Sequence, residues 1–228
     1  MKISIIIPVL NEAALIAQTL STLQPLRAAG HELIVVDGGS SDDTIALSEP
    51  LADQIIRCSR GRGRQMNGGA KIAQGDILLF LHTDTLLPKG ADQLIIREME
   101  KREKNWGRFD VRLSGGHLLL RIVEWLMNWR SRITGIATGD QAIFVQKKLF
   151  ETVGGFPDID LMEDITLSRL LKRYGSPLCL WQRVVTSSRR WQRNGILRTI
   201  LLMWLLRLAY FYKTDPRRLA QLYDSRKE

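Results

Sequence analysis

Short apolar segments that alternate with helical segments are the feature that most constrains the fold of this chain. The apolar segments are Ile3–Val9, Leu33–Val36, Gln54–Arg57 and Ile77–Leu81. Strands that are buried on both faces are continuously apolar in this way, and their alternation with helices favours parallel pairing. The sequence therefore predicts an α/β fold built on a doubly wound, mostly parallel sheet.

Helices are predicted between and after these strands. The predicted segments are an amphipathic helix from Asn11-Glu12 to about Ala29, a short helix capped by Ser41 or Asp42, a helix that follows the basic glycine loop Gly61–Gly69 and runs through Ala73, and Ala91–Arg102. Gly30 is a typical stop signal for the first helix, and Ser or Asp side chains accept hydrogen bonds from helix amides.

The pattern changes after Trp106. The predicted strands there are an antiparallel or edge strand over Phe109–Leu113, a short strand over Ala142–Val145, and strands over Leu178–Trp181 and Val184–Ser188. The predicted helices are a Leu- and Trp-rich helix over Leu118–Trp129, a helix with an acidic first turn over Glu163–Arg173, a long apolar helix over Ile196–Tyr212 and a last short helix from Asp215-Pro216. We see no internal repeat or linker, so we expect one domain over residues 1–228 with a divergent second half.

Composition places the chain among ordinary globular proteins. Its 228 residues allow one sizeable core, with 45% hydrophobic and 25% charged residues. Cys58 and Cys179 indicate neither a disulfide framework nor a zinc cluster, and they suit a reducing compartment. The N-terminus enters a predicted strand directly, without the segments of a signal peptide, so we expect a cytoplasmic protein.

The net charge of +9 is concentrated near the C-terminus. Residues 183–228 contain 11 Lys or Arg and 3 Asp or Glu, a net charge of +8. A basic tail of this kind suits an anionic membrane surface, nucleic acid or an acidic ligand, and composition alone does not choose among them.

Polar side chains follow several of the predicted strands. Asn11-Glu12 follows the first strand, Asp37 ends the second, and His82-Thr83-Asp84 follows the fourth. In open α/β sheets, ligands bind at the carboxyl ends of the strands. A carboxylate beside an imidazole can hold a divalent cation there, and the cation can hold a diphosphate. Taken alone, each of these segments is equally consistent with a polar turn.

In order, these segments resemble the family 2 glycosyltransferases, which are nucleotide-sugar-dependent enzymes of the GT-A fold. The matching segments are Ser4–Glu12, Ile34–Thr44, the strand that ends in His82-Thr83-Asp84, and Met162-Glu163-Asp164. The resemblance covers roughly residues 1–175. The nearest subgroup has a Leu-His-x-Asp-Thr metal motif and a late Ser-x-Arg-Arg-Trp motif, and some of its members are associated with arsenosugar or carotenoid-type glycosylation.

The resemblance implies a division of labour along a single GT-A domain. About residues 1–105 form the nucleotide-binding half, about 106–192 the acceptor half, and about 193–228 a C-terminal helical basic tail. The implied reaction is inverting transfer of a sugar from a nucleotide-diphosphate sugar to an acceptor hydroxyl. The resemblance implies a UDP-linked donor. By resemblance Asp164 is the general base and Glu163 contacts the acceptor. Alternatively, the two carboxylates only stabilise the start of a helix, because the helix macrodipole favours negative charge there.

The donor-binding residues implied by the resemblance lie at strand ends and in the glycine loop: Pro8, Asn11, Glu12, Asp37, Arg64, Asn67, His82 and Thr83. The Asp37 carboxylate can accept the imide N–H of uracil, and Arg64 can bind a carbonyl or a phosphate. Alternatively, Asn11 caps a helix and Asp37 forms a turn. We expect Arg60 and Arg62 to be solvated.

A divalent metal ion, Mn or Mg, is the implied cofactor, and Asp84 is its implied ligand. The family's motif is often Asp-x-Asp, and His82 stands here in place of the first aspartate. One aspartate with phosphate oxygens and waters can still hold such an ion. For His82 three roles remain open, namely coordination, hydrogen bonding to the diphosphate, and a structural role.

Two later segments are candidates for the acceptor or diphosphate side of the site. Asp140 and Gln141 line the acceptor side or form a turn before a strand. Arg189, Arg190 and Trp191 close over the diphosphate or begin the basic surface.

The apolar segment Ile196–Tyr212 is too short and too charged to span a membrane, because a span needs about 20 largely uncharged residues. Flanked by Lys213, Arg217 and Arg218, it fits a helix in the interface of an anionic membrane, or a helix that packs on the domain or on a second subunit in a homodimer. Leu118–Trp129 is its candidate partner in either case. A lipid-like acceptor accounts for both segments, and we expect no nucleic acid partner.

Two other functions fit parts of the sequence. A nucleotidyltransferase would use the same fold and cation–phosphate site, although it has less use for Glu163-Asp164 far downstream. A non-catalytic basic protein would bind membrane or nucleic acid through residues 183–228. Polar groups at several separate strand ends argue against this last function.

Overall fold

The computed structural model describes residues 1–212, 214–216, 218, 219 and 222, without the side chains of Arg190, Asn194 and Leu197. Its strands are β1 (Ile3–Val9), β2 (Glu32–Asp37), β3 (Gln54–Arg57), β4 (Ile77–Phe80), β5 (Thr85–Leu86), β6 (Trp106–Leu113), β7 (Phe144–Gln146) and β8 (Leu178–Thr186). Its α-helices are α1 (Ala13–Ala28), α2 (Thr44–Ser48), α3 (Arg62–Ile72), α4 (Ala91–Lys101), α5 (Leu118–Thr134), α6 (Lys147–Thr152), α7 (Glu163–Leu171), α8 (Arg189–Asn194) and α9 (Ile196–Phe211). Short 3-10 helices cover Gly139–Gln141 and Lys172–Tyr174.

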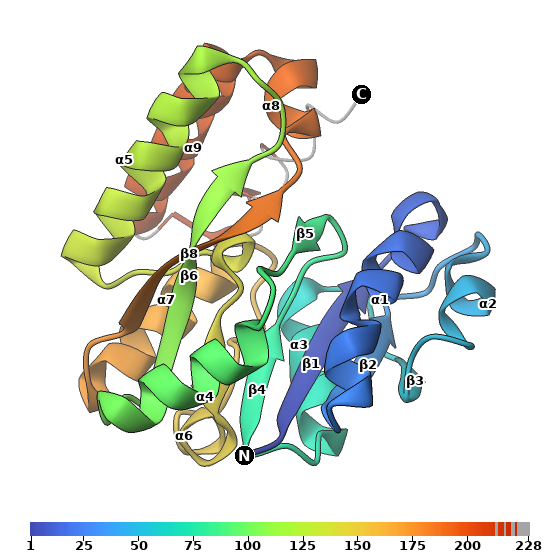
Figure 1. Ribbon diagram of the computed structural model, residues 1–228. Coiled ribbons are helices and arrows are strands. Elements are labelled where there is room, and N and C mark those ends of the chain that lie inside the picture. The colour runs from blue at the N-terminus through green and yellow to red at the C-terminus, as the bar shows by residue number, and fades with distance from the viewer. Residues whose placement is uncertain (213, 217, 220–221, 223–228) are drawn as a thin grey trace.

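Within the described residues the strands form one eight-stranded sheet in the order β3-β2-β1-β4-β7-β6-β8-β5. β1 pairs in parallel with β2 and β4, and β2 pairs in parallel with β3. β7 runs antiparallel to both β4 and β6, and β6 runs parallel to β8. The predicted α/β sheet is thus confirmed, with its parallel part in the first half of the chain (Figure 1).

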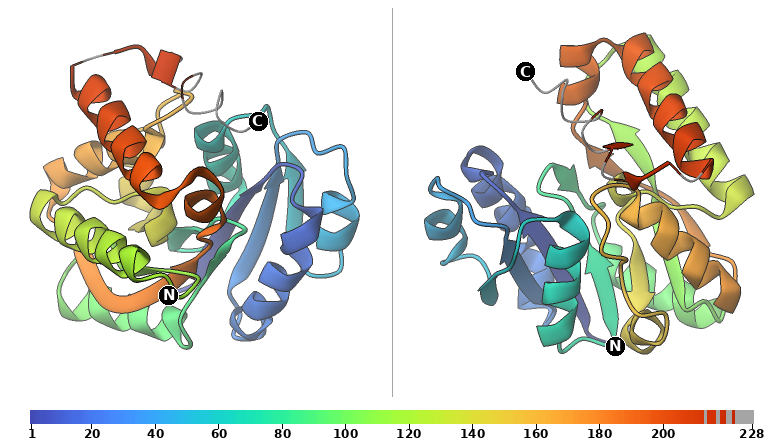
Figure 2. Two further views of the ribbon diagram at one scale, coloured as in Figure 1. Left: turned by 90° about the horizontal axis from the view of Figure 1, so that it is seen from above. Right: turned by 180° about the vertical axis from the view of Figure 1, so that it is seen from behind.

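Helices cover both faces of this sheet. Ile3, Ile5 and Ile7 of β1 pack on the face that α1, α4 and α5 cover, whereas Ile6 packs on the opposite face with residues of α3, α6 and α7. Figure 2 shows the same arrangement from above and from behind. Burial on both faces explains why the first strand is apolar at nearly every position.

The prediction of a loop over Gly61–Gly69 was wrong, because α3 begins at Arg62. The glycines serve close packing of a helix on the sheet. A Cβ atom on Gly69 would lie 2.5 Å from Cγ2 of Ile6 and 3.0 Å from Cγ2 of Val36. Two strands and the helix therefore approach more closely than any other residue at this position would allow.

Two predictions for the second half also need correction. β6 is an interior strand between β7 and β8, so Phe109–Leu113 is not an edge strand. The strands predicted separately over Leu178–Trp181 and Val184–Ser188 are one strand, β8. Its register against β6 shifts between Phe109 and Asp110. This irregularity accommodates the exposed polar residues that interrupt the apolar pattern of β8 in the sequence.

Helix α5 is attached to β6 by polar side chains. Asn128 accepts a hydrogen bond from the Val111 amide at 2.8 Å and donates one to the Val111 carbonyl at 3.0 Å. Glu124 accepts from the Leu113 amide at 2.6 Å, so the side of the helix that faces the strand is partly polar. The helix also runs one turn beyond the predicted Trp129.

Helix α9 packs on the start of α7. Leu202 and Leu206 form a small apolar cluster with Met162 and Ile165. Most of the helix predicted after Asp215-Pro216, with the flanking Lys213 and Arg217, lies outside the described residues. None of the helices in the described part of the chain has the length and apolar content that crossing a membrane requires.

We predict opposite effects for alanine at two neighbouring glycines of α3. Gly69→Ala should lower the free energy of unfolding by about 1–3 kcal/mol, because the added methyl group overlaps the side chains of Ile6 and Val36. Gly68→Ala is the matched control, since its added Cβ lies 3.5 Å from the Cys58 sulfur, an ordinary contact. The control should be neutral or stabilising by up to about 1 kcal/mol in urea unfolding. Equal effects of the two substitutions would contradict this explanation.

Candidate active site

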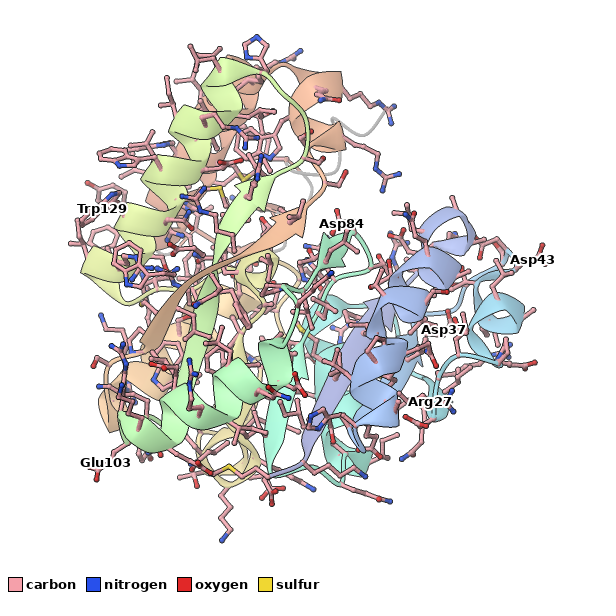
Figure 3. The ribbon with its side chains drawn as sticks, viewed as in Figure 1. Arg27, Asp37, Asp43, Asp84, Glu103 and Trp129 are labelled. Carbon is pink, nitrogen blue, oxygen red and sulfur yellow. The ribbon has the colours of Figure 1, made fainter. Side chains whose placement is uncertain are left out.

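The loops after β1 and β2 are joined by side-chain hydrogen bonds. The Asp37 carboxylate is fully buried and accepts hydrogen bonds from the amides of Gly39 and Ser40 at 3.1 and 3.0 Å. Asn11 accepts one from the Ser41 amide at 2.9 Å, and its own amide donates to the Ser40 hydroxyl at 2.9 Å. The structure thus brings Asn11 and Asp37 to one edge of the sheet. Figure 3 labels Asp37 and Asp84.

Two carboxylates from different strand ends lie close together at this edge. Burial raises the pKa of Glu12, and the negative charge of Asp84 acts in the same direction. The charges of Arg189 and Arg62 and a hydrogen bond with Thr83 lower the same pKa. Pro8, the remaining predicted residue of the first strand, pairs with Val36 in the sheet.

Asp84 and Glu12 are also the residues that could hold a cation. In the described part of the chain, no group of three or more His, Cys, Asp or Glu side chains has the arrangement of a metal site. Two neighbouring carboxylates nevertheless suit a hard cation such as Mg²⁺ or Mn²⁺ when phosphate and water oxygens complete its shell. The donor set therefore fits a cation that arrives with a diphosphate.

His82 connects the end of β4 to the second half of the chain. Its Nδ1 atom lies 3.6 Å from Oδ1 of Asp140. The imidazole also lies against Gly139, where a Cβ atom would be 2.5 Å from His82 Cε1. The Gly139 amide donates a hydrogen bond to Oδ2 of Asp164 at 2.9 Å. A chain of direct contacts thus joins His82, two residues before Asp84, to Asp164. His82 and Asp164 line the same cavity, whereas Asp84 is not among its lining residues.

A cavity of about 110 Å³ lies at this junction. Met203, Leu206 and Arg207 of α9 form part of its wall, so the C-terminal helix helps to enclose it. The polar side chains that line it come from five separate elements or loops: Arg62, His82, Asp140, Glu163, Asp164 and Arg207.

Glu163 and Asp164 occupy the first turn of α7, as predicted. Met162 precedes them with a φ of 70°, a left-handed conformation that turns the chain sharply into the helix. The Asp164 carboxylate accepts a second hydrogen bond, from the Ile165 amide at 2.7 Å. Glu163 is only 6% exposed, and burial raises its pKa to about 7, with the charge of Asp164 acting in the same direction.

The cavity contains two arginines that sequence reasoning did not assign to it. Arg62 is exposed, as expected, but it also lines the cavity, and its charge lowers the pKa of both Glu12 and Glu163. Burial lowers the pKa of Arg207, whereas the charges of Asp164 and Asp140 raise it. For Arg207, the signal available in the sequence was its position within a largely apolar helix.

Asp140 is surrounded by these positive groups. Partial burial raises its pKa, but the hydrogen bond and charge of His82, with the charges of Arg62 and Arg207, outweigh that effect and lower the pKa overall. Its neighbour Gln141 is fully buried and completes a capping box with Thr138, so Gln141 does not line the cavity.

Arg64 and Asn67 of α3 are occupied by protein partners. Arg64 Nε lies 2.5 Å from Oδ1 of Asp158. Asn67 donates to the Phe156 carbonyl at 2.8 Å and accepts from the Phe156 amide at 2.9 Å. Both side chains therefore hold the loop that leads to Glu163, and their contact with a nucleotide stays a prediction.

The late Arg-Arg-Trp segment is divided between two environments. Arg189 is exposed at the start of α8, where its charge reaches Glu12. Trp191 is half-buried against the main core. The side chain of Arg190 lies outside the described part of the structure.

Comparison with known proteins identifies the family. Residues 4–147 match the sequence profile "Glycosyl transferase family 2". The chain belongs to glycosyl transferase family 2. A "PGL/p-HBAD biosynthesis glycosyltransferase" of Mycobacterium bovis is 32% identical over 169 residues, which cover 67% of this chain and 62% of that protein. This family 2 chain thus spans about 62% of the length of the curated relatives that it matches.

Solved structures identify the fold as GT-A. Residues 1–349 of TarS from S. aureus, in complex with UDP-GlcNAc, superpose with a TM-score of 0.70 and 19% identity, covering 83% of this chain and 59% of that chain. The mannosyltransferase PcManGT from Pyrobaculum calidifontis, in complex with GDP-Man and Mn²⁺, gives a TM-score of 0.65 and 21% identity, covering 91% and 61%.

The raised pKa of Glu163 predicts a pH dependence of stability. Between about pH 4.5 and about pH 7 the native state keeps a proton on Glu163 that the unfolded chain has lost, so stability falls as pH rises through this window. Glu163→Gln removes the effect. Its free energy of unfolding relative to wild type should therefore rise with pH, by about 3 kcal/mol in total. Urea unfolding across the window measures this, and Glu151→Gln, a more exposed carboxylate on α6, should show no such slope.

Proposed function

We propose that this family 2 protein transfers a sugar, with inversion, from a UDP-linked donor to an acceptor hydroxyl. The observation that carries the proposal is the cavity in which His82, from the end of a parallel strand, meets Asp164, from the start of a helix. Residues from the half proposed to bind the sugar donor and from the half proposed to bind the acceptor thereby line one small cavity. The GT-A fold of the chain supports the same function.

Asp164 acts as the general base in this proposal. Inverting transfer requires a carboxylate that removes the proton of the acceptor hydroxyl as that oxygen attacks the anomeric carbon. Hydrogen bonds from the amides of Gly139 and Ile165 fix the orientation of the Asp164 carboxylate. Glu163, with a pKa of about 7, retains a proton near neutral pH and can donate a hydrogen bond to the acceptor.

The donor binds at the edge formed by the loops after β1, β2 and β4. The Asp37 carboxylate, held by its own loop, accepts from the imide N–H of uracil, and Arg62 and Arg189 lie where positive charge would meet a diphosphate. Asp84 and Glu12 would hold a divalent cation together with the diphosphate oxygens. Such a cation neutralises charge on the departing diphosphate.

A panel of nucleotides tests the donor half of the proposal. UDP should raise the melting temperature in the presence of Mn²⁺, because a ligand that binds only the native state stabilises it. The increase should be largely lost in Asp84→Asn and kept in Asp43→Asn, an exposed aspartate next to α2. Stabilisation by GDP alone would overturn the choice of uracil as the nucleobase of the donor. Release of pyrophosphate from a nucleoside triphosphate would point to nucleotidyl transfer.

Replacement of Asp164, the proposed general base, tests the acceptor half of the proposal. Asp164→Asn should lower kcat by about 10²–10⁴-fold, since the amide keeps the size of the side chain and can accept one of the two backbone hydrogen bonds through its single oxygen, but it cannot take up the proton. The UDP-dependent increase in melting temperature should persist, which separates loss of chemistry from loss of folding. A variant with unchanged kcat would exclude Asp164 as the base.

A further inference from the structure

Helix α5 presents apolar side chains to solvent on its outer side. Trp125 is 59% exposed and Ile133 is 78% exposed, while the side of the helix that faces β6 carries Glu124 and Asn128. Figure 3 shows Trp129 on this outer side, away from the body of the molecule. A surface helix normally directs its apolar side to the core. Because α5 already buries Leu120, Val123 and Met127 in the main core, it is apolar on two sides, and the second, exposed side is suited to an apolar ligand.

Helix α9 lies beside α5 (Figure 2). The two helices line an apolar groove of about 580 Å³. Trp204 and Phe211 of α9 face Trp125, Trp129 and Ile133 of α5 across it. The volume lies within the range of small-molecule sites, roughly 300–1,000 Å³. The groove thus has the size and the composition to hold an aliphatic chain.

The groove adjoins the candidate active site. Met203 and Arg207 line both the apolar groove and the cavity that contains Asp164. A molecule with its chain in the groove would therefore direct its polar end toward the general base.

Arg130, in the groove, forms no ion pair with any residue that the structure describes. Among the described residues, the buried Nε and Nη2 atoms of Arg130 have no hydrogen-bond partner. Burial and the charge of Arg207 lower the pKa of Arg130 to about 10, while Asp164 acts in the opposite direction. Buried guanidinium donors without partners are costly, and an anionic ligand group would satisfy them.

We propose that the α5–α9 groove binds the aliphatic chain of an anionic membrane lipid whose headgroup lies between Arg130 and Arg207. The apolar side of a second copy would fill the groove but would leave these donors unpaired, so a lipid is the occupant that the charges favour. That the lipid is the acceptor rests on the proposed function. In that reaction a headgroup oxygen bonds to the anomeric carbon as the bond to the diphosphate oxygen breaks, the diphosphate takes the electron pair, and Asp164 takes the hydroxyl proton.

Sedimentation with lipid vesicles tests the apolar part of this proposal. The protein should bind vesicles of phosphatidylcholine that contain phosphatidylglycerol, an anionic lipid with headgroup hydroxyls. Trp204→Ser should weaken binding about tenfold or more, because the indole no longer enters an apolar environment. Trp181→Ser is a matched control, since both tryptophans are 66% exposed and Trp181 lies on β8 outside the groove. Ile133→Ser provides a second groove variant if Trp204→Ser folds poorly.

The charge of the lipid is tested with an arginine pair. Arg130→Gln should weaken binding to the anionic vesicles by about fivefold or more and leave the weaker binding to pure phosphatidylcholine unchanged. Arg97→Gln, on α4 with a side chain that is 71% exposed, should change neither.

Three outcomes would overturn the proposal. These are equal losses for Trp204→Ser and Trp181→Ser, binding that ignores phosphatidylglycerol, and a dimer in solution that Trp204→Ser dissociates without any binding to vesicles. Melting temperatures with UDP separate this result from the proposed function. If UDP has no effect on the wild-type protein but vesicle binding depends on Trp204 and Arg130, the lipid site stands and the transferase proposal falls.

Discussion

The contact between His82 and Gly139 is the constraint on which the site depends. The imidazole at the end of β4 occupies the space that any side chain at residue 139 would need. Because the glycine amide also binds Asp164, one residue sets the separation between a strand end from the first half of the chain and a helix start from the second. The pairing of β4 with β7 supports this contact, since it brings the segment around Gly139 next to the parallel sheet.

Charge balance is the second organising principle. Asp140, Glu163 and Asp164 line one small cavity, where their mutual repulsion and their burial would favour protonation. Arg62 and Arg207 oppose this effect, and each comes from a different helix. Glu163, which is only 6% exposed, still has a pKa of about 7. The site is therefore poised for groups that carry negative charge and for proton transfer near neutral pH.

The third principle is the use of polar side chains to attach α5. Asp110 of β6 accepts hydrogen bonds from Arg108 and Arg132, and Asn128 pairs with the backbone of the same strand. Buried polar groups must find partners, so these contacts fix which side of α5 faces the sheet. As a consequence the tryptophans on the other side remain exposed beside α9, next to the proposed site of sugar transfer.

Much of the framework follows from local sequence. The continuous apolar runs and the polar residues after them determined the parallel strands and the edge at which Asn11, Asp37 and Asp84 gather, because these features depend only on which residues are buried and where a strand ends. The first turn of α7, with Glu163 and Asp164, was equally predictable from the sequence.

Long-range contacts decided the rest. The glycines of α3 look like a loop until the side chains of Ile6 and Val36 show that a helix must pack there. The arginines of the cavity are ordinary surface residues in the sequence, and Arg64 and Asn67 resemble ligand-binding residues until Asp158 and Phe156 are found beside them. In each case the partner is remote along the chain, and only the tertiary structure determines which charge or side chain fills the neighbouring space.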